Sequence, residues 1–93
     1  MKTLLTLLEE HGLLVNCQTE WHDESLPFPR TDHREIKAGD AFIAIKGERF
    51  DGHQLIGEAR KLGAALIVGE DHQADIQVKD SRKAAALYAS EYY

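Results

Sequence analysis

The chain is poor in several features that define large classes of protein. Among its 93 residues Cys17 is the single cysteine, which excludes an internal disulfide and fits a reducing cytoplasm. No apolar run approaches the roughly 20 residues of a membrane-spanning helix, so no membrane partner is expected. Acidic residues outnumber basic ones by 16 to 11 and leave a net charge of -5. That charge argues against a nucleic-acid partner, because phosphates are bound by basic faces.

Signatures of catalysis are missing as well. The phosphate-binding pattern GxxxxGK[ST] is absent, so we do not expect this chain to carry out ATP chemistry alone, and GxSxG is absent too. No HxH or HExxH spacing occurs, so we expect no metal ligands and no catalytic residue in this chain. A metal site assembled from distant histidines, as in a small metallohydrolase, stays open as an alternative. The five histidines are scattered as His11, His22, His33, His53 and His72.

The elements that are present point to one small α/β domain. Hydrophobic residues make up 43% and charged residues 29% of the chain, which is typical of a folded protein. The first half predicts a helix over residues 2–11, a strand over 17–22 and a second strand beginning within 31–35. The second half alternates more regularly. Its predicted elements are a strand over 41–45, a helix over 52–62, strands over 65–68 and 76–78, and a helix over 81–93.

This order predicts the architecture of the domain. Short, continuous apolar runs such as AFIAI are typical of strands that are buried on both faces. Strands that alternate with helices favour parallel pairing. We therefore predict an α/β fold in which a mixed, partly parallel β-sheet is packed with about three helices.

Two polar stretches follow or end predicted strands. They are TDHREIKAGD, residues 31–40, and FIAIKGERFDGH, residues 42–53. Loops at strand ends are where α/β sheets bind their ligands. A plainer interpretation is also open: Asp32 and Arg34 form a surface ion pair, Gly39 serves a turn, and Asp51 caps a helix.

The motifs in these stretches resemble the N-terminal domain of the Mur ligases MurE and MurF. That family runs TDSR, then GDLFVA, then a glycine shortly before DGH, then an A…GA…V pattern. This chain has TDHR at 31–34, GDAFIA at 39–44, Gly47, and DGH at 51–53. VKDSRKAAALYASEYY, residues 78–93, is similar to the segment before the family's central ATPase domain. The leucine-rich opening and the closing YASEYY favour MurE over MurF.

The resemblance implies a function for the chain as a whole. Residues 1–93 would form the domain that binds the UDP portion of a UDP-N-acetylmuramoyl-peptide, within a cytoplasmic, ATP-dependent ligase of peptidoglycan synthesis. ATP and Mg²⁺ would act in the central ATPase domain, a partner that lies outside this chain. In a MurE-type enzyme the substrate is UDP-MurNAc-L-Ala-D-Glu and the added residue is a diamino acid. The alternatives are a MurF-type domain and a non-catalytic α/β module that binds protein.

The resemblance also implies site residues. By position, the family's uridine contacts fall on Thr31, His33, Glu48, Arg49 and Phe50. Arg49 is suited to pair with the diphosphate, and Phe50 to offer an apolar face to the base or ribose, whereas Glu48 would contribute its backbone. The family commonly has Ser where this chain has His33, so either the pocket differs in shape or this ring points away. Supporting roles are expected for Asp32, Arg34, Gly47, Asp51, Gly52 and His53.

Overall fold

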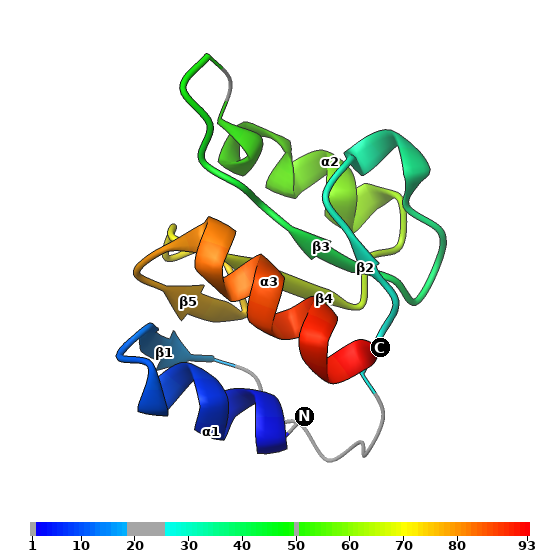
Figure 1. Ribbon diagram of the computed structural model, residues 1–93. Helices are drawn as coiled ribbons and strands as arrows, with labels where there is room; N and C mark the ends of the chain where they lie inside the picture. The colour runs from blue at the N-terminus through cyan, green and yellow to red at the C-terminus, as the bar shows by residue number, and fades with distance from the viewer. Residues whose placement is uncertain (1, 19–25, 50) are drawn as a thin grey trace.

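One five-stranded sheet with helices on both faces organises the chain (Figure 1). The computed structural model describes residues 2–18, 26–49 and 51–93. The strand order is β1-β5-β4-β3-β2, with β1 antiparallel to β5 and the other neighbours parallel. The predicted mixed, partly parallel sheet is therefore confirmed. The strands are β1 Leu14–Cys17, β2 Pro29–Arg30, β3 Ala41–Ile43, β4 Leu66–Gly69 and β5 Ile76–Val78.

The helices lie in two layers, one on each face of the sheet. Helices α1 (Lys2–Glu10) and α3 (Ser81–Tyr92) cover one face, and α2 (Ile56–Lys61) covers the other. Two short 3₁₀ helices, η1 (His33–Glu35) and η2 (Gly52–Leu55), follow strands β2 and β3. No helix among the described residues is long and apolar enough to cross a bilayer.

Alternation along the central strands explains why both faces are buried. In β3, Ala41 and Ile43 pack toward α1 and α3, whereas Phe42 between them packs with Ile56 of α2. All three β3 residues are at most 1% exposed. A strand that is covered on both faces needs an apolar residue at every position, which is the continuous run seen in the sequence.

Several predicted elements are confirmed and others are corrected. The strand at 76–78 is confirmed, and the first helix ends two residues before Gly12, whose φ of 68° suits a glycine. The predicted helix over 52–62 is divided into η2 and α2. The first strand, β1, lies earlier than the predicted 17–22, and residues 19–22 are outside the described part of the chain.

The strand predicted to begin within 31–35 is wrong. The Asp32 carboxylate accepts a hydrogen bond from the backbone N–H of Arg34 at 3.0 Å and so caps the short helix η1. Such a local bond competes with strand pairing. The strand in this region is β2, which ends at Arg30, just before the motif.

The connection between β4 and β5 is unusually short. Only residues 70–75 join these parallel neighbours, whereas a parallel crossover normally needs a dozen or more residues. Asp75 holds the connection against β4: its N–H donates to the Ile67 carbonyl at 2.9 Å, and its carboxylate accepts from the Ile67 N–H at 2.8 Å. Arg60 of α2 donates to the Gln73 carbonyl at 2.8 Å.

Candidate functional site

A cavity of about 450 Å³ opens at the carboxyl ends of the parallel strands β2 and β3. One side is the segment that follows β2, and the other is the chain after β3 together with η2. Edges of this kind are the usual ligand-binding positions of α/β sheets. The lining residues are Thr31, Asp32, His33, Arg34, Ile45, Gly52 and Leu55.

An ion pair shapes the first side of this cavity. The Arg34 guanidinium donates from Nε to Asp32 Oδ1 at 3.0 Å and from Nη2 to Asp32 Oδ2 at 2.8 Å. These hydrogen bonds from Arg34 hold the pKa of Asp32 at about 2. Asp32 in turn neutralises much of the positive charge of Arg34. The ion pair of the plainer interpretation is therefore confirmed, and the same two residues also line the cavity.

Thr31 and His33 flank this ion pair. Thr31 is exposed, and His33 keeps 29% of its side-chain surface accessible. Its Nδ1 lies 3.9 Å from Asp32 Oδ1, which is too long for a hydrogen bond. Both residues line the cavity, as expected for groups that could contact a ligand.

Gly52 forms the opposite wall and is tightly constrained. Its N–H donates to the Ile45 carbonyl at 2.9 Å. A Cβ placed on Gly52 would lie 3.0 Å from both the N and the O of Ile45. Only glycine therefore fits here without a shift of the backbone. The predicted cap is confirmed, because Asp51 Oδ1 accepts from the His53 N–H at 3.0 Å.

The structure brings together only part of the predicted site. Glu48 and Arg49 are exposed in the loop after β3 and are not among the lining residues, and neither is Gly47. Phe50 lies outside the described residues. Ile45 and Leu55 also line the cavity but are not among the predicted site residues, because they fall within the predicted strand over 41–45 and the predicted helix over 52–62. Their one sequence signal is position, since they lie on either side of GERFDGH, the segment 47–53 that follows β3.

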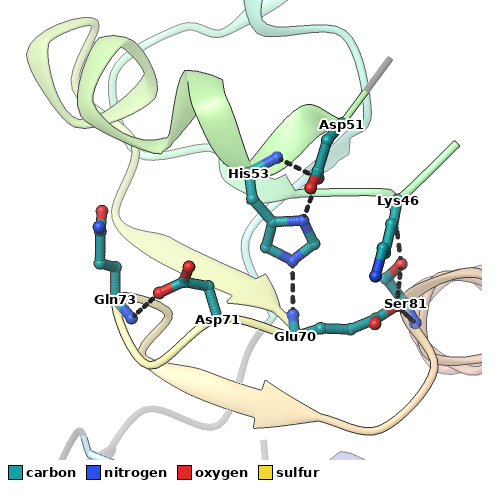
Figure 2. Close-up of polar contacts among 7 residues, drawn as sticks. All are labelled: Lys46, Asp51, His53, Glu70, Asp71, Gln73 and Ser81. Atoms are coloured by element: carbon teal, nitrogen blue, oxygen red, sulfur yellow. Dashed lines mark hydrogen bonds and ion pairs between the residues drawn. The ribbon is translucent and has the colours of Figure 1, made fainter. Parts of the chain in front are cut away.

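A second, smaller cavity of about 220 Å³ is built around His53 (Figure 2). Only 9% of this side chain is exposed. Its Nδ1 lies 2.5 Å from Asp51 Oδ1, and its Nε2 accepts from the backbone N–H of Glu70 at 2.6 Å. Hydrogen bonds from the His53 backbone and ring lower the pKa of Asp51. The cavity is lined by Lys46, Asp51, His53, Glu70 and Asp71.

The contacts of His53 continue into α3. Glu70 Oε2 accepts from the Ser81 N–H at 2.9 Å and from the Ser81 hydroxyl at 2.8 Å. The same hydroxyl accepts from the Lys46 N–H at 3.0 Å. The start of η2, the end of β4, the start of α3 and the chain after β3 are therefore joined by one hydrogen-bonded network (Figure 2). Within the described ranges, no group of three or more His, Cys, Asp or Glu side chains could hold a metal ion.

Comparison with known proteins decides the family. The family described as "Mur ligase family, catalytic domain" matches residues 28–93. The chain belongs to the Mur ligase family. The UDP-N-acetylmuramoyl-L-alanyl-D-glutamate--2,6-diaminopimelate ligase of Clostridium perfringens is 47% identical over 70 residues, which cover 69% of this chain and 14% of that protein. The ligase of the same name from Clostridium tetani is 38% identical over an alignment that covers all of this chain and 20% of the relative.

Solved Mur ligase structures share the fold. The MurF ligase from Thermotoga maritima, in complex with ADP, is 35% identical with a TM-score of 0.62, over 70% of this chain and 16% of that one. A UDP-N-acetylmuramoylalanyl-D-glutamyl-2,6-diaminopimelate--D-alanyl-D-alanyl ligase from Acinetobacter baumannii is 28% identical with a TM-score of 0.66, and the match covers 88% of this chain and 19% of that one. The chain spans a fifth or less of the length of these Mur ligases. The resemblance seen in its motifs is thus confirmed at the level of the family.

Proposed function

We propose that this chain is the N-terminal, UDP-binding domain of a cytoplasmic Mur ligase that adds 2,6-diaminopimelate to UDP-N-acetylmuramoyl-L-alanyl-D-glutamate in peptidoglycan synthesis. The curated relatives carry that activity in their names. The observation that carries the proposal is the larger cavity, because it joins the TDHR motif and Gly52 of the DGH motif at the carboxyl edge of the sheet. These segments are separated in sequence, and the parallel pairing of β2 with β3 brings the ends of the two strands together.

The lining of the cavity suits a uridine. Uracil has two carbonyl acceptors and one N–H donor, and the Thr31 hydroxyl can both donate and accept a hydrogen bond. Ile45 and Leu55 supply apolar surface for the flat ring. Ligand sites of this kind are largely apolar with a few polar groups that fix orientation.

The charge of a diphosphate needs a cation that is not already paired. Asp32 neutralises Arg34 at close range, so Arg34 is poorly suited to this role. Asp51 occupies the start of η2, so the diphosphate is not expected there either. Arg49, which is exposed in the loop that joins Ile45 to Gly52, is the cation that would bind the diphosphate. Glu48 and Phe50 of the same loop complete the proposed uridine contacts.

The remaining chemistry belongs to parts of the enzyme outside this chain. These residues contain neither the GxxxxGK[ST] loop nor, where the structure describes them, a metal-binding group. ATP and Mg²⁺ would therefore bind in the central ATPase domain. The MurF-type alternative is supported by the solved structures of that type, and it predicts the same nucleotide in the same cavity.

A ligand titration tests the proposal. The ¹⁵N-labelled chain is titrated with UDP-N-acetylglucosamine and, in parallel, with ADP-glucose, which keeps the diphosphate and a sugar but changes the base. We expect UDP-N-acetylglucosamine to shift the amides of Thr31, His33, Ile45, Gly52 and Leu55, and ADP-glucose to shift them far less. Equal responses to the two nucleotides, or no response at millimolar concentration, would contradict a uridine site.

A further inference from the structure

His53 uses both nitrogens of an almost fully buried ring. A backbone N–H can only donate, so the contact from Glu70 requires an Nε2 that carries no proton. The one ring proton then lies on Nδ1 and is donated to Asp51 Oδ1. These partners assign the Nδ1–H tautomer and an uncharged ring.

His53 belongs to the same short helix as one wall of the larger cavity. His53 is in η2 between Gly52 and Leu55, two residues that line that cavity. On its other side the ring packs closely on β4: a Cβ placed on Gly69 would lie 2.9 Å from His53 Nε2. The ring therefore has little room, and a change in its contacts would be passed to η2.

We propose that His53 is a positioning residue for the nucleotide cavity, and that its uncharged ring holds the wall made by Gly52 and Leu55 through paired bonds to Asp51 and Glu70. The inference rests on the proposed function, since the uridine nucleotide is the ligand of that wall. His53 itself lines the smaller cavity, so its role is exerted through η2.

Protonation of the His53 ring would break one of these hydrogen bonds. A second ring proton turns Nε2 from an acceptor into a donor, which the Glu70 N–H cannot accept. The charged groups that face the ring are Asp51 from the start of η2, Glu70 and Asp71 after β4, and Lys46 after β3. A ring that carries a proton on both nitrogens therefore loses its contact with the Glu70 backbone. The form that holds the wall is the uncharged one, and nucleotide affinity falls as the pH falls.

Two variants separate the bonds of the ring. In His53→Gln the side-chain carbonyl can take the place of Nε2 as the acceptor for Glu70. In His53→Asn the side-chain amide can take the place of Nδ1 as the donor to Asp51. Neither side chain titrates, so both variants should lose the pH dependence. His53→Gln should retain more affinity, because the bond from Glu70 links η2 to β4.

The binding experiment follows the Kd of UDP-N-acetylglucosamine between about pH 8 and pH 5. This probe is chosen because its diphosphate, blocked by the sugar, keeps a constant charge over this range. We expect the wild-type affinity to fall about tenfold, the value of one good hydrogen bond, and the affinity of His53→Gln to stay flat. His33→Asn is the control, because His33 is a histidine that lines the nucleotide cavity itself. Loss of the pH dependence in His33→Asn, with its retention in His53→Gln, would overturn the proposal.

A ligand-free measurement separates this inference from the proposed function. ¹⁵N NMR of the His53 ring should show a protonated Nδ1 and a bare Nε2 at neutral pH. On acidification the amides of Gly52 and Leu55 should shift in the wild type and stay still in His53→Gln. A protonated Nε2 at neutral pH, or equal shifts in the variant, would refute the positioning role. If the NMR result is as expected and no UDP-sugar binds at any pH, the proposed function fails and the positioning of the wall stands.

Discussion

An alanine at position 52 has no room for its methyl group. The added Cβ would lie 3.0 Å from the N and O atoms of Ile45 and 3.4 Å from Ala44 Cα, all of which are backbone atoms. Backbone at the end of a buried strand cannot swing aside as a flexible side chain can. Forcing an extra carbon into a packed site costs about 1–3 kcal/mol. We therefore expect Gly52→Ala to lower the free energy of unfolding by about this amount.

The same substitution should weaken nucleotide binding. Either Gly52 or Ile45 must move to admit the methyl group, and both line the larger cavity. Urea denaturation gives the loss of stability, provided that the m-value is unchanged. Titration with UDP-N-acetylglucosamine, under conditions where the variant is folded, gives the loss of affinity. We expect that loss to be about tenfold, or about 1.4 kcal/mol.

Gly57 provides a matched control in the same region. It lies in α2, is exposed, and has no atom within 4 Å of an added Cβ. Alanine is preferred over glycine in a helix by up to about 1 kcal/mol, so Gly57→Ala should be neutral or stabilising and bind UDP-sugar normally. If Gly52→Ala matched wild type in stability and binding, the tight wall described here would be refuted.

Three further substitutions test contacts elsewhere in the chain. Ser81 is 1% exposed, and its hydroxyl bonds to two partners, so Ser81→Ala should lower the free energy of unfolding by about 1–3 kcal/mol. Ser90 is exposed on the same helix, and the control Ser90→Ala should change this free energy by less than about 0.5 kcal/mol. Tyr88→Phe removes a buried 2.7 Å bond to a backbone carbonyl and should cost about 1–2 kcal/mol in urea denaturation; no loss would mean that the carbonyl finds another donor. Because the pKa of Asp32 is depressed, its contribution to stability is present above about pH 4 and is lost as the pH falls toward about 2. Arg34→Gln should raise this pKa toward its usual value in a ¹³C NMR titration, and an unchanged pKa would contradict the assigned cause.

Elements with a strong local pattern could be predicted from the sequence. The apolar runs of β3 and β4 need residues that are buried on both faces, and that need is visible in the chain itself. The prediction of a strand that begins within residues 31–35 was wrong, because the Asp32 carboxylate accepts a hydrogen bond from the backbone N–H of Arg34. The position of β1 depends on pairing with β5, as in Leu14 with Val78, and such distant pairing leaves little trace in a short segment.

The candidate site divides in the same way. Thr31, His33 and Gly52 could be proposed because the TDHR and DGH motifs that contain them resemble those of the Mur ligases. Ile45 and Leu55 could not be told from core residues, because a cavity wall and a core use the same apolar side chains. The network behind the wall was out of reach as well. The partner of His53 Nε2 is the backbone N–H of Glu70. Every residue except proline has such a group, so the residue type at position 70 does not reveal this contact.

The short connection between β4 and β5 has a consequence for the order of folding. The paired residues Val68 and Ile76 are close along the chain, whereas the paired residues Leu14 and Val78 must meet across most of it. Because the entropy of loop closure grows with the logarithm of loop length, the second pairing costs about 2 kcal/mol more than the first. The β4–β5 pair can therefore form early, and β1 can join at the edge last. Changes in β1 would then mainly speed unfolding, and changes in β4 would also slow folding.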